Sequence, residues 1–333
     1  MTSPEVTVII PTYNRASLIC TAIESAAGDG VEVIVVDDGS TDETFETLKK
    51  YQILPNFHYI KQNNKGAASA RNVGINKATS PYIAFLDSDD FYTKDSLNKR
   101  VEILKNYSPN KGFIFGDFNR IINDVLSPQT LHQKSDLLRA IIDDNTIEAI
   151  NPNAVKLGLD IYDACCGICA MHTPTVVFAK KLVEKAGLFN ESMERCEDWE
   201  WMLRVIPHAD IFYDAGPVAT VRFGANNSLS SSALPSLKAH LSFLKSSKSL
   251  LKVNSTYNDL HFSEMNHVYE KLSRALIDVG DNAAARSICK DWRCHSGLQY
   301  ALILTLFKSL CPSNVVTYLS AFKKRILNNY HLI

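Results

Sequence analysis

Two clusters of carboxylates in the first ninety residues carry the clearest chemical signal in the chain. Asp87 and Asp89 directly follow one apolar stretch, and Asp37 and Asp38 follow another. Two carboxylates this close together hold one hard divalent cation through oxygen ligands and leave positions open for phosphate oxygens. A cation in that place stabilises the charge of a nucleotide leaving group. The alternative is a solvated Asp-rich turn, but the strongly apolar stretch from Tyr82 to Leu86 favours a functional site.

The cluster around Asp38 has its own alternative. Ser40, Thr41 and Asp42 follow at once and are typical of a turn that caps a helix. Asp38 differs from them because a carboxylate at the end of a strand can accept a hydrogen bond from a ring N–H or from a ribose hydroxyl. We therefore keep Asp38 as a candidate ligand residue and assign the following residues to the turn and cap.

A third segment, from Asn64 to Asn72, predicts a helix that begins with small residues. Such a helix start allows close backbone approach and favours an anion. The segment contains no G-x-G-x-x-G, and Lys65 precedes the glycine instead of following it, so neither dinucleotide nor Walker motifs apply. Arg71 lies one to two turns into the helix, where it could return to a nucleotide. The alternative is a helix packed on the sheet, with Arg71 in a surface ion pair.

Alternating strands and helices must position these residues. Apolar, β-branched stretches predict buried strands, and stretches of helical periodicity separate them. This order implies a mostly parallel sheet with helices on both faces, whose ligands bind outside the carboxyl ends of the strands. Three strand ends then present Pro11 to Asn14, Asp37 to Gly39, and Asp87 to Asp89. The expected strands are Val6–Ile10, Val31–Val36, Phe57–Ile60 and Tyr82–Leu86, and the helices are Ala16–Ala27, Ser40 or Thr41 to Tyr51, and Ala67–Ala78.

Beyond Asp90 the pattern is looser, and Ser127 to Asp160 permits no assignment. The later strands are expected at Phe113–Phe118, Thr175–Phe178, Ile211–Tyr213 and Val218–Phe223. The later helices are expected at Asp95–Lys105, Ala179–Ala186 and Glu197–Ile206. Ser and Asn are enriched from Asn226 to Pro235, which is typical of a linker or loop, and the rest of the chain has helical patterns.

In order and spacing, these segments resemble the inverting glycosyltransferase family 2, which has the nucleotide-diphospho-sugar transferase (GT-A) fold. The resemblance runs from about Val6 to Asn227 and is strongest before Asp90. It rests on Val8 to Arg15, Val35 to Asp42, Asn64 to Asn72, and Phe85 to Asp90. It implies an α/β, GT-A-like, mostly parallel sheet flanked by helices, to which we add a C-terminal helical subdomain.

The resemblance also implies a nucleotide-sugar site that takes a divalent cation, Mn²⁺ or Mg²⁺. Thr12 and Tyr13 would contact uracil and ribose, and Asp38 would hold the base with help from Arg71. Asp87 would lie near the ribose and the metal, with Asp89 as the principal metal ligand. The full set expected to bind the nucleotide is Pro11, Thr12, Tyr13, Asn14, Arg15, Asp38, Lys65, Arg71, Asp87 and Ser88.

A later Glu-Asp pair, Glu197 and Asp198, matches the pair that opens a helix in this family. Asp198 would be the general base that takes the proton of the acceptor hydroxyl. Inversion follows because one in-line displacement needs a base and no enzyme nucleophile. In isolation, both residues would be first-turn acids favoured by the helix dipole.

Three further residues bear on the acceptor or the diphosphate. Glu197, Trp199 and Arg222 are candidates for such contacts, and one of Trp199 and Trp201 is expected to be core packing. The family often has a His two residues after that Arg, where this chain has Gly224. A metal or phosphate role of that His is therefore missing here.

The overall composition narrows the classes of partner. The 333 residues are 46% hydrophobic and 21% charged, with a formal net charge of -1. No global field therefore attracts nucleic acid. We expect no signal peptide, because Met1 to Glu5 is short and polar, and no apolar run reaches the ~20 residues of a membrane span. The 8 cysteines are expected to be reduced thiols. Cys166 and Cys169 have the spacing of half a zinc site, but no second pair exists, so buried apolar thiols are favoured.

We expect a catalytic domain at 1–227, with its nucleotide half at about 1–118 and its acceptor half at about 119–227. A linker at 228–236 and a helical region at 237–333 would follow. Leu298 to Leu310 is apolar, and Val315 to Leu327 is amphipathic with basic residues nearby. That region packs on itself or on a second subunit of a homo-oligomer. Alternatively, it rests on an anionic membrane, which would place a cytoplasmic protein at the inner face of the cell membrane.

The sequence therefore predicts transfer of a sugar from a nucleotide donor, with UDP-linked sugars favoured, to a hydroxyl of a glycan or lipid-linked acceptor. Two alternatives remain. A nucleotidyltransferase would need a basic loop near the N-terminus for a triphosphate, and only Arg15 is there. A non-catalytic binding module would not need the complete set of Asp38, Asp87, Asp89 and Asp198.

Overall fold

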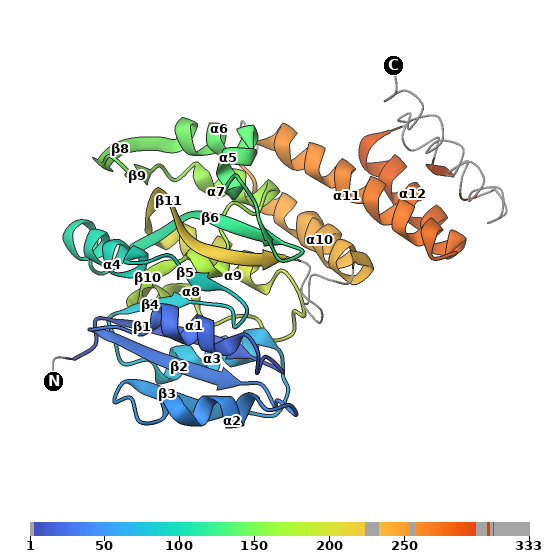
Figure 1. The fold of residues 1–333 in the computed structure, drawn as a ribbon. Helices are drawn as coiled ribbons and strands as arrows, with labels where there is room; N and C mark the ends of the chain where they lie inside the picture. Colours follow the sequence, from blue (N-terminus) through green and yellow to red (C-terminus); the bar gives the residue numbers. More distant parts are fainter. Residues whose placement is uncertain (1–2, 224–232, 253–256, 298–304, 307–308, 310–333) are drawn as a thin grey trace, which may run out of the picture. The chain divides into compact units, whose positions relative to one another are not determined.

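The computed structural model describes residues 3–223, 233–252, 257–297, 305–306 and 309. The chain divides into two compact units, Met1–Ser231 and Ser232–Ile333. The first unit contains a sheet of eleven strands with helices on its faces, and the described part of the second is helical. We describe each unit by itself, and Figure 1 gives the labels of the elements.

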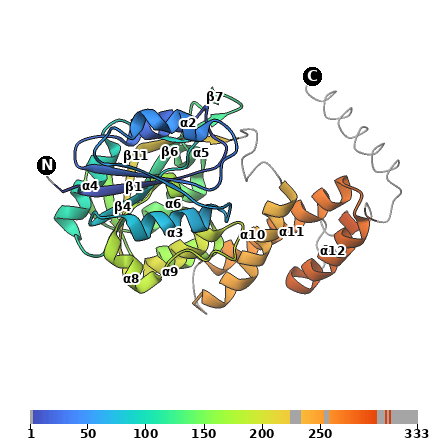
Figure 2. The same cartoon turned by 90° about the horizontal axis from the view of Figure 1, so that it is seen from below.

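The first half of unit 1 is the predicted alternation of strands and helices. Four parallel strands lie in the order β3-β2-β1-β4. Figure 2 shows α2 and α3 on opposite sides of β1 and β4. The strands are β1 (Val6–Thr12), β2 (Val31–Asp37), β3 (Phe57–Lys61) and β4 (Tyr82–Phe85), and the helices are α1 (Ile19–Ala26), α2 (Thr44–Leu48) and α3 (Ala67–Lys77).

The expected cap of the second helix is wrong. Helix α2 begins at Thr44, several residues after Ser40 and Thr41, and a 3-10 turn at Lys49–Tyr51 completes it. The Asp42 carboxylate accepts from the Thr44 amide at 3.0 Å, whereas the Ser40 hydroxyl accepts from the Asn14 amide at 2.9 Å. The polar run after Asp38 therefore ties two loops together before the helix starts.

The second half extends the sheet with mixed pairing, in the order β4-β10-β6-β11-β9-β8. Strands β6 and β11 run parallel, and β10 is antiparallel to both β4 and β6. Two short strands lie beside this path, with β5 on β11 and β7 on β6. The strands are β5 (Phe91–Tyr92), β6 (Gly112–Ile122), β7 (Val125–Leu126), β8 (Thr146–Asn151), β9 (Ala154–Leu157), β10 (Val177–Ala179) and β11 (Asp210–Phe223).

Two strand predictions need correction. The two late strands expected at Ile211–Tyr213 and Val218–Phe223 are one strand, β11, whose register shifts on both sides of Pro217. Proline cannot donate to the ladder, so the strand bulges there and does not end. The strand expected at Thr175–Phe178 begins only at Val177, because Thr173–Thr175 forms a 3-10 turn around Pro174.

Helices in the second half cover the sheet and complete its core. They are α4 (Ser96–Tyr107), α5 (Leu131–Lys134), α6 (Asp136–Asn145), α7 (Ile161–Gly167), α8 (Val183–Ala186) and α9 (Glu197–Val205). Helices α4 and α9 confirm the expected positions, and Gly187 ends α8 as expected. Trp201 of α9 is fully buried among three phenylalanines, Phe85, Phe178 and Phe189.

The second unit is helical, as expected. Its helices are α10 (Ala233–Ser247), α11 (Asn258–Asp278) and α12 (Asn282–Ser296). Because α10 begins at Ala233, the last residues of the expected linker at 228–236 are helical. Asp281 caps α12 by accepting from the Ala284 amide at 3.0 Å. The amphipathic stretch Val315–Leu327 and most of Leu298–Leu310 lie outside the described residues. Among the described residues, no helix has the length and apolarity that a membrane crossing requires.

Candidate active site

The site lies at the carboxyl ends of β1, β2 and β4, which are neighbours in the sheet. Thr12 at the end of β1 is in register with Asp37 at the end of β2. The Asp38 amide donates to the Thr12 carbonyl at 2.8 Å. On the other side of β1, the Leu86 amide donates to the Ile9 carbonyl at 3.1 Å and carries the chain into Asp87. Parallel pairing therefore brings the two carboxylate clusters to one edge of the sheet, as the sequence predicts.

The Asp37–Asp38 cluster is saturated by donors from the protein. The Asp38 carboxylate accepts from the Gln62 side chain at 2.7 Å and from the amides of Lys65 and Gly66 at 2.8 Å each. Asp37 accepts from the Ser40 amide at 2.8 Å and from the Tyr59 hydroxyl at 2.7 Å. A carboxylate has about four acceptor positions, so Asp38 keeps about one for a ligand. Its main partners are the loop and the start of α3.

The loop after β1 combines structural residues with exposed ones. Asn14 has a left-handed backbone (φ 52°), which asparagine tolerates better than most residues. Its side-chain oxygen accepts from the Thr41 amide at 2.8 Å and the Asp42 amide at 3.3 Å. Tyr13 is 44% exposed beside it, and the hydroxyl of buried Thr12 has no hydrogen-bond partner among the described residues. Asn14 therefore shapes the loop, while Thr12 and Tyr13 present groups that a nucleoside can contact.

Pro11, Lys65 and Ser88 have less distinctive surroundings. Pro11 is a buried residue of β1, and Ser88 is buried in the turn after β4. The Lys65 amide is used by Asp38, while its side chain is exposed. These residues line the expected edge of the sheet, and their binding roles stay predictions.

Arg71 joins two parts of the site that are far apart in sequence. Its guanidinium donates to Asp87 at 2.9 Å and to Glu197 at 2.8 Å. Arg71 is buried, so the alternative of a surface ion pair is wrong. The attraction of Asp87, Glu197 and Asp198 outweighs burial and raises the pKa of Arg71 above its usual value. The described contacts make Arg71 a bridge between carboxylates, and its expected help in holding the nucleotide base stays a prediction.

The turn after β4 concentrates negative charge. Asp89 lies 3.7 Å from the Arg15 guanidinium, and the Asp90 carboxylate accepts from the Arg222 amide at 2.9 Å. Burial and the neighbouring Asp87 raise the pKa of Asp89. Burial and both other carboxylates raise the pKa of Asp90 well above its usual range. The cluster therefore holds more negative charge than its surroundings neutralise.

The donors of this cluster fit a hard divalent cation shared with a diphosphate. Carboxylate oxygens are the ligands that Mg²⁺ and Mn²⁺ prefer, and Mg²⁺ is usually held by one or two carboxylates plus substrate phosphates. Over the part of the chain that the structure describes, no group of three or more His, Cys, Asp or Glu residues could hold a metal. Asp89 with Asp87 would therefore supply only part of a coordination shell.

Glu197 and Asp198 open helix α9, as the sequence predicts. Cys196, just before them, has a left-handed backbone (φ 60°), which is uncommon for a residue other than glycine. Burial and Asp198 raise the pKa of Glu197, and Arg71 opposes that rise. Asp198 accepts from the Trp199 amide at 2.8 Å, which orients its carboxylate. Asp198 directly follows Glu197, which Arg71 links to Asp87.

Neither tryptophan lies on an open face. Trp199 is 6% exposed and its indole N–H donates to the Cys165 carbonyl at 2.6 Å. The Trp201 indole donates to the Gly187 carbonyl at 2.9 Å. We expected one of them in the core, and both are there. Trp199 therefore packs in the interior, where it joins α9 to Cys165 of α7, and has little exposed surface for a sugar.

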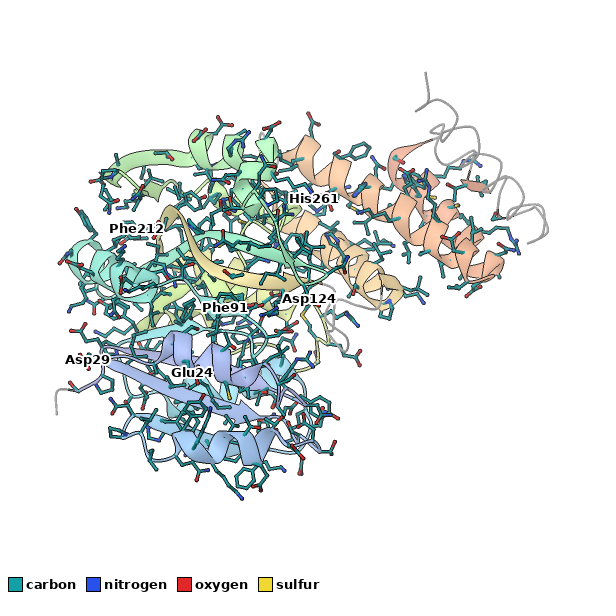
Figure 3. All side chains as sticks on the ribbon, in the orientation of Figure 1. Glu24, Asp29, Phe91, Asp124, Phe212 and His261 are labelled. Atoms are coloured by element: carbon teal, nitrogen blue, oxygen red, sulfur yellow. The ribbon has the colours of Figure 1, made fainter. Side chains whose placement is uncertain are left out.

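Arg222 lies close to the carboxylate cluster. Its guanidinium is 3.8 Å from the Asp124 carboxylate and lies over the ring of Phe91, with its central carbon 5.9 Å from the ring centre. Figure 3 labels Phe91, on β5 beside β11, and Asp124, in the turn between β6 and β7. The positive charge of Arg222 opposes the rise in the pKa of Asp89 that burial and Asp87 cause, so Arg222 lies near that carboxylate, and its contact with a diphosphate stays a prediction. Gly224, where the family often has His, lies outside the described residues.

Sequence reasoning missed several residues that complete the site. Thr173 places its hydroxyl 3.5 Å from the Asp87 carboxylate. Burial lowers the pKa of the neighbouring His172, although Asp198 and Asp87 oppose this. Asn72 binds the segment before α9. Thr173 and His172 lie in a stretch with no periodic pattern, and only the position of Asn72 beside Arg71 was a usable signal.

The cysteines form no zinc site over the described residues. Among the described residues, Cys165, Cys166, Cys169 and Cys196 form no disulfide bond. Burial, with smaller contributions from neighbouring acids, raises the pKa of the Cys166 and Cys196 thiols to about 12. These groups are protonated thiols near neutral pH, in agreement with the buried-thiol prediction.

The comparisons with known proteins agree with this geometry. Residues 7–152 match the family model described as glycosyl transferase family 2. An uncharacterised glycosyltransferase of Rickettsia bellii is 31% identical over 197 residues, which are 58% of this chain and 25% of that protein. The poly(ribitol-phosphate) beta-N-acetylglucosaminyltransferase TarP of Staphylococcus aureus is 32% identical over 152 residues, which are 43% of this chain and 45% of TarP. The chain spans between 25% and 62% of the first five curated relatives.

Two solved structures share the fold. S. aureus TarS 1–349 in complex with UDP-GlcNAc superposes with a TM-score of 0.57 and 18% identity, over 89% of this chain and 93% of that one. The mannosyltransferase PcManGT of Pyrobaculum calidifontis, in complex with GDP-Man and Mn²⁺, has a TM-score of 0.55 and 18% identity, over 93% and 88%. With the strand order and the carboxylates at the strand ends, these likenesses show that the chain has the GT-A fold, and residues 7–152 match the glycosyl transferase family 2 model.

Proposed function

We propose that the chain is an inverting glycosyltransferase that uses a nucleoside diphosphate sugar, with UDP-sugars as the favoured donors. The acceptor is a hydroxyl on a glycan or lipid-linked molecule in polysaccharide or glycoconjugate synthesis. One observation carries the proposal: the guanidinium of Arg71 contacts Asp87 of the donor side and Glu197 of the acceptor side. One side chain therefore joins the carboxylate cluster after β4 to the first turn of α9, which carries Asp198.

The comparisons support the class of donor. TarP is named as an N-acetylglucosaminyltransferase, and TarS has been solved with UDP-GlcNAc. The first half of this chain presents Thr12, Tyr13 and Asp38 at the strand ends where a nucleoside would bind. Arg15 and Arg222 flank the cluster around Asp89, and each can contact a diphosphate oxygen.

Asp89 and Asp87 are the residues that would hold a divalent cation, and the Mn²⁺ in PcManGT supports this. When bound, the cation would neutralise charge on the diphosphate leaving group. The raised pKa of Asp89, caused by burial and by Asp87, fits a cluster that gains from an added positive charge.

The chemical step belongs to Asp198. Its carboxylate takes the proton of the acceptor hydroxyl, and the oxygen of that hydroxyl forms a bond to C1 of the donor sugar. The bond from C1 to the diphosphate oxygen breaks on the opposite face, and its electron pair leaves with the nucleoside diphosphate. One displacement inverts the configuration at C1. The first turn of α9, whose Trp199 amide donates to the Asp198 carboxylate, stabilises the ionised base before the proton moves.

A panel of nucleotide sugars tests this proposal. The purified chain is incubated with each donor, Mn²⁺ and a set of glycan and lipid-linked acceptors, and released nucleotide and glycosylated product are measured. Asp198→Asn is expected to keep donor binding and to lower transfer by about 10²–10⁴-fold. Near-normal turnover of that variant would remove Asp198 as the base. Release of pyrophosphate would indicate a nucleotidyltransferase, and donor binding without turnover would indicate a binding module.

The proposal includes the layout of the chain and its place in the cell. Residues 1–118 would bind the nucleotide and 119–227 the acceptor, while the C-terminal helices would hold a cytoplasmic enzyme at the inner face of the membrane or form a homo-oligomer. Liposome flotation of the full chain and of a truncation near Ser232, each checked for folding by circular dichroism, tests the membrane contact. Equal flotation of the two proteins would contradict it, and light scattering gives the oligomeric state.

A further inference from the structure

Helix α3 begins and ends on the donor side of the molecule. Its start is held by Asp38, which accepts from the amides of Lys65 and Gly66 at 2.8 Å each. Further along, Gly74 packs so closely on β1 that an added Cβ would lie 2.3 Å from the Ile9 side chain. One contact joins Asp38 to backbone amides, and the other packs Gly74 on buried Ile9. Together they fix α3 to the strands that carry the carboxylates.

Asn72, on α3, fastens the segment that leads into α9. Its side-chain oxygen accepts from the Phe189 amide at 2.8 Å. Its side-chain nitrogen donates to the Phe189 carbonyl at 3.0 Å and to the Glu191 carboxylate at 2.8 Å. Asn72 is 4% exposed, and its two hydrogen bonds to Phe189 are shielded from water. One amide side chain therefore fixes both backbone groups of a residue 117 positions away.

Arg71, the preceding residue, fastens the first turn of α9 itself through Glu197 and reaches Asp87 with its other nitrogen. Its guanidinium also lies over the Phe189 ring, with its central carbon 5.7 Å from the ring centre. The Phe189 ring stacks on Trp201 of α9, with ring centres 4.7 Å apart. The ring is thus held from α3 on one side and from α9 on the other.

The segment between these anchors has little regular structure of its own. Between the end of α8 at Ala186 and the start of α9 at Glu197 lie ten residues without helix or strand, and Cys196 closes them in a left-handed conformation. Such a segment keeps one conformation only when its surroundings determine it. Asp198 follows directly, and the contacts from α3 act together with those that Trp201 and Arg204 of α9 make to the start of the segment.

We propose that Arg71 and Asn72 are positioning residues that set the place of Asp198 relative to Asp87 and Asp89. This inference rests on the proposed function, in which Asp198 is the base. Reactions of two bound groups depend steeply on their geometry, and a displacement of about 1 Å can cost about 10²-fold in rate. Loosening either tie should therefore lower kcat while the donor still binds.

The test uses the full-length chain. Asn72→Ala is expected to lower kcat by about 10–10²-fold, while KM for the donor and the Kd of UDP with Mn²⁺ stay within about threefold. Asn145→Ala is the matched control, because Asn145 is another 4% exposed asparagine, in α6, with a hydrogen bond to the Ile141 carbonyl at 2.8 Å. Arg71→Lys, which keeps the charge but loses the planar fork, should fall between the wild type and Arg71→Gln in kcat.

A second readout does not depend on activity. Hydrogen–deuterium exchange of residues 188–200 should become faster in Asn72→Ala and stay unchanged in Asn145→Ala. If Asn72→Ala fails to fold, Arg71→Lys is used for both measurements. An unchanged kcat and exchange rate in a folded variant would overturn the inference, as would a loss of UDP affinity that matches the loss of kcat. If the wild type transfers no sugar, the proposed function fails, and the exchange data alone still decide whether α3 holds the start of α9.

Discussion

The two carboxylate clusters are at neighbouring strand ends, yet they have opposite surroundings. Asp37 and Asp38, after β2, accept five hydrogen bonds from the protein, at 2.7 to 2.8 Å. The cluster after β4 has fewer donors, and its acids raise one another's pKa: burial and the adjacent carboxylates act on Asp89 and Asp90. Protein donors compensate the charge of Asp37 and Asp38. The carboxylates after β4 are compensated less and can interact with a positively charged ligand.

This difference shows that position in the fold does not by itself assign a role. Both clusters follow apolar strands and both lie where α/β sheets bind ligands. The number of protein donors separates them. Asp38 organises the loop that starts α3, whereas the cation nearest to Asp89 that the described contacts give is the Arg15 guanidinium, 3.7 Å away. We therefore expect the cluster of Asp37 and Asp38 to stabilise the fold around the site, and the cluster around Asp89 to bind the ligand.

The largest effect is expected at Asp89. Asp89→Asn removes the principal candidate cation ligand, which should weaken cation-dependent UDP binding and transfer by several kcal/mol, or roughly 10²–10³-fold. Calorimetric titration of UDP with and without Mn²⁺ measures the change. Asp42→Asn, in the exposed part of the other cluster, is the control and should leave binding unchanged. Wild-type affinity in Asp89→Asn would contradict the assignment.

A stability effect of intermediate size is expected at Asp38. Asp38→Ala leaves the Gln62 side chain and the amides of Lys65 and Gly66 without their acceptor, which should cost about 1–3 kcal/mol of unfolding free energy. Urea unfolding followed by circular dichroism gives the value. If the variant were as stable as the wild type, Asp38 would not stabilise the fold around the site and its role would lie with the ligand.

At Asp90 a substitution should stabilise the fold, and the gain in melting temperature should depend on pH. A carboxyl whose folded pKa is raised above the ordinary 3.8 stabilises the fold at low pH, and that contribution is lost as pH rises through the raised pKa. Asp90→Asn keeps an oxygen for the Arg222 amide and removes the charge. Its melting temperature should exceed that of the wild type by about 2–4 °C at pH 7. The advantage should vanish below pH 3.8, and an advantage that grew in acid would show that Asp90 is not a strained charge.

The smallest change is expected at Tyr59. Tyr59→Phe removes one donor to Asp37, at 2.7 Å, and keeps the ring. Because the Ser40 amide still bonds to that carboxylate, the loss should be about 0.5–1.5 kcal/mol. Thermal unfolding in matched buffers measures it. A loss of activity larger than the loss of stability would give Asp37 a role in ligand binding instead of in stabilising the fold.

The sequence allowed the first half of the fold to be predicted because its signals are local. Continuous apolar strands, helical periodicity and strand-end acids occur within short windows. The edge strand β8, by contrast, is almost entirely exposed and has no alternating pattern, so its segment could not be assigned. The single strand β11 was split because Pro217 is usually a strand breaker, and the structure accommodates it in a bulge.

The contacts of the site that escaped prediction join segments that are distant in the sequence. Arg71 and Glu197 are 126 residues apart, and nothing in either local sequence indicates that they meet. The burial of both Trp199 and Trp201 likewise depends on packing on two sides of α9, against Cys165 and Phe189. The left-handed backbone of Asn14 and its contact with Thr41 likewise join two loops, while its expected role at the nucleotide stays a prediction.

The central claim is that the cluster after β4 binds the nucleotide through a cation while the cluster after β2 stabilises the fold around the site. The most direct measurement is calorimetric titration of UDP into the wild type, Asp89→Asn and Tyr59→Phe, with Mn²⁺ and then with excess chelator. The account predicts that the wild type and Tyr59→Phe bind UDP with Mn²⁺ and lose most of that affinity with chelator. Asp89→Asn should bind weakly in both conditions. Binding that is equally tight in Asp89→Asn and indifferent to chelator would contradict the claim.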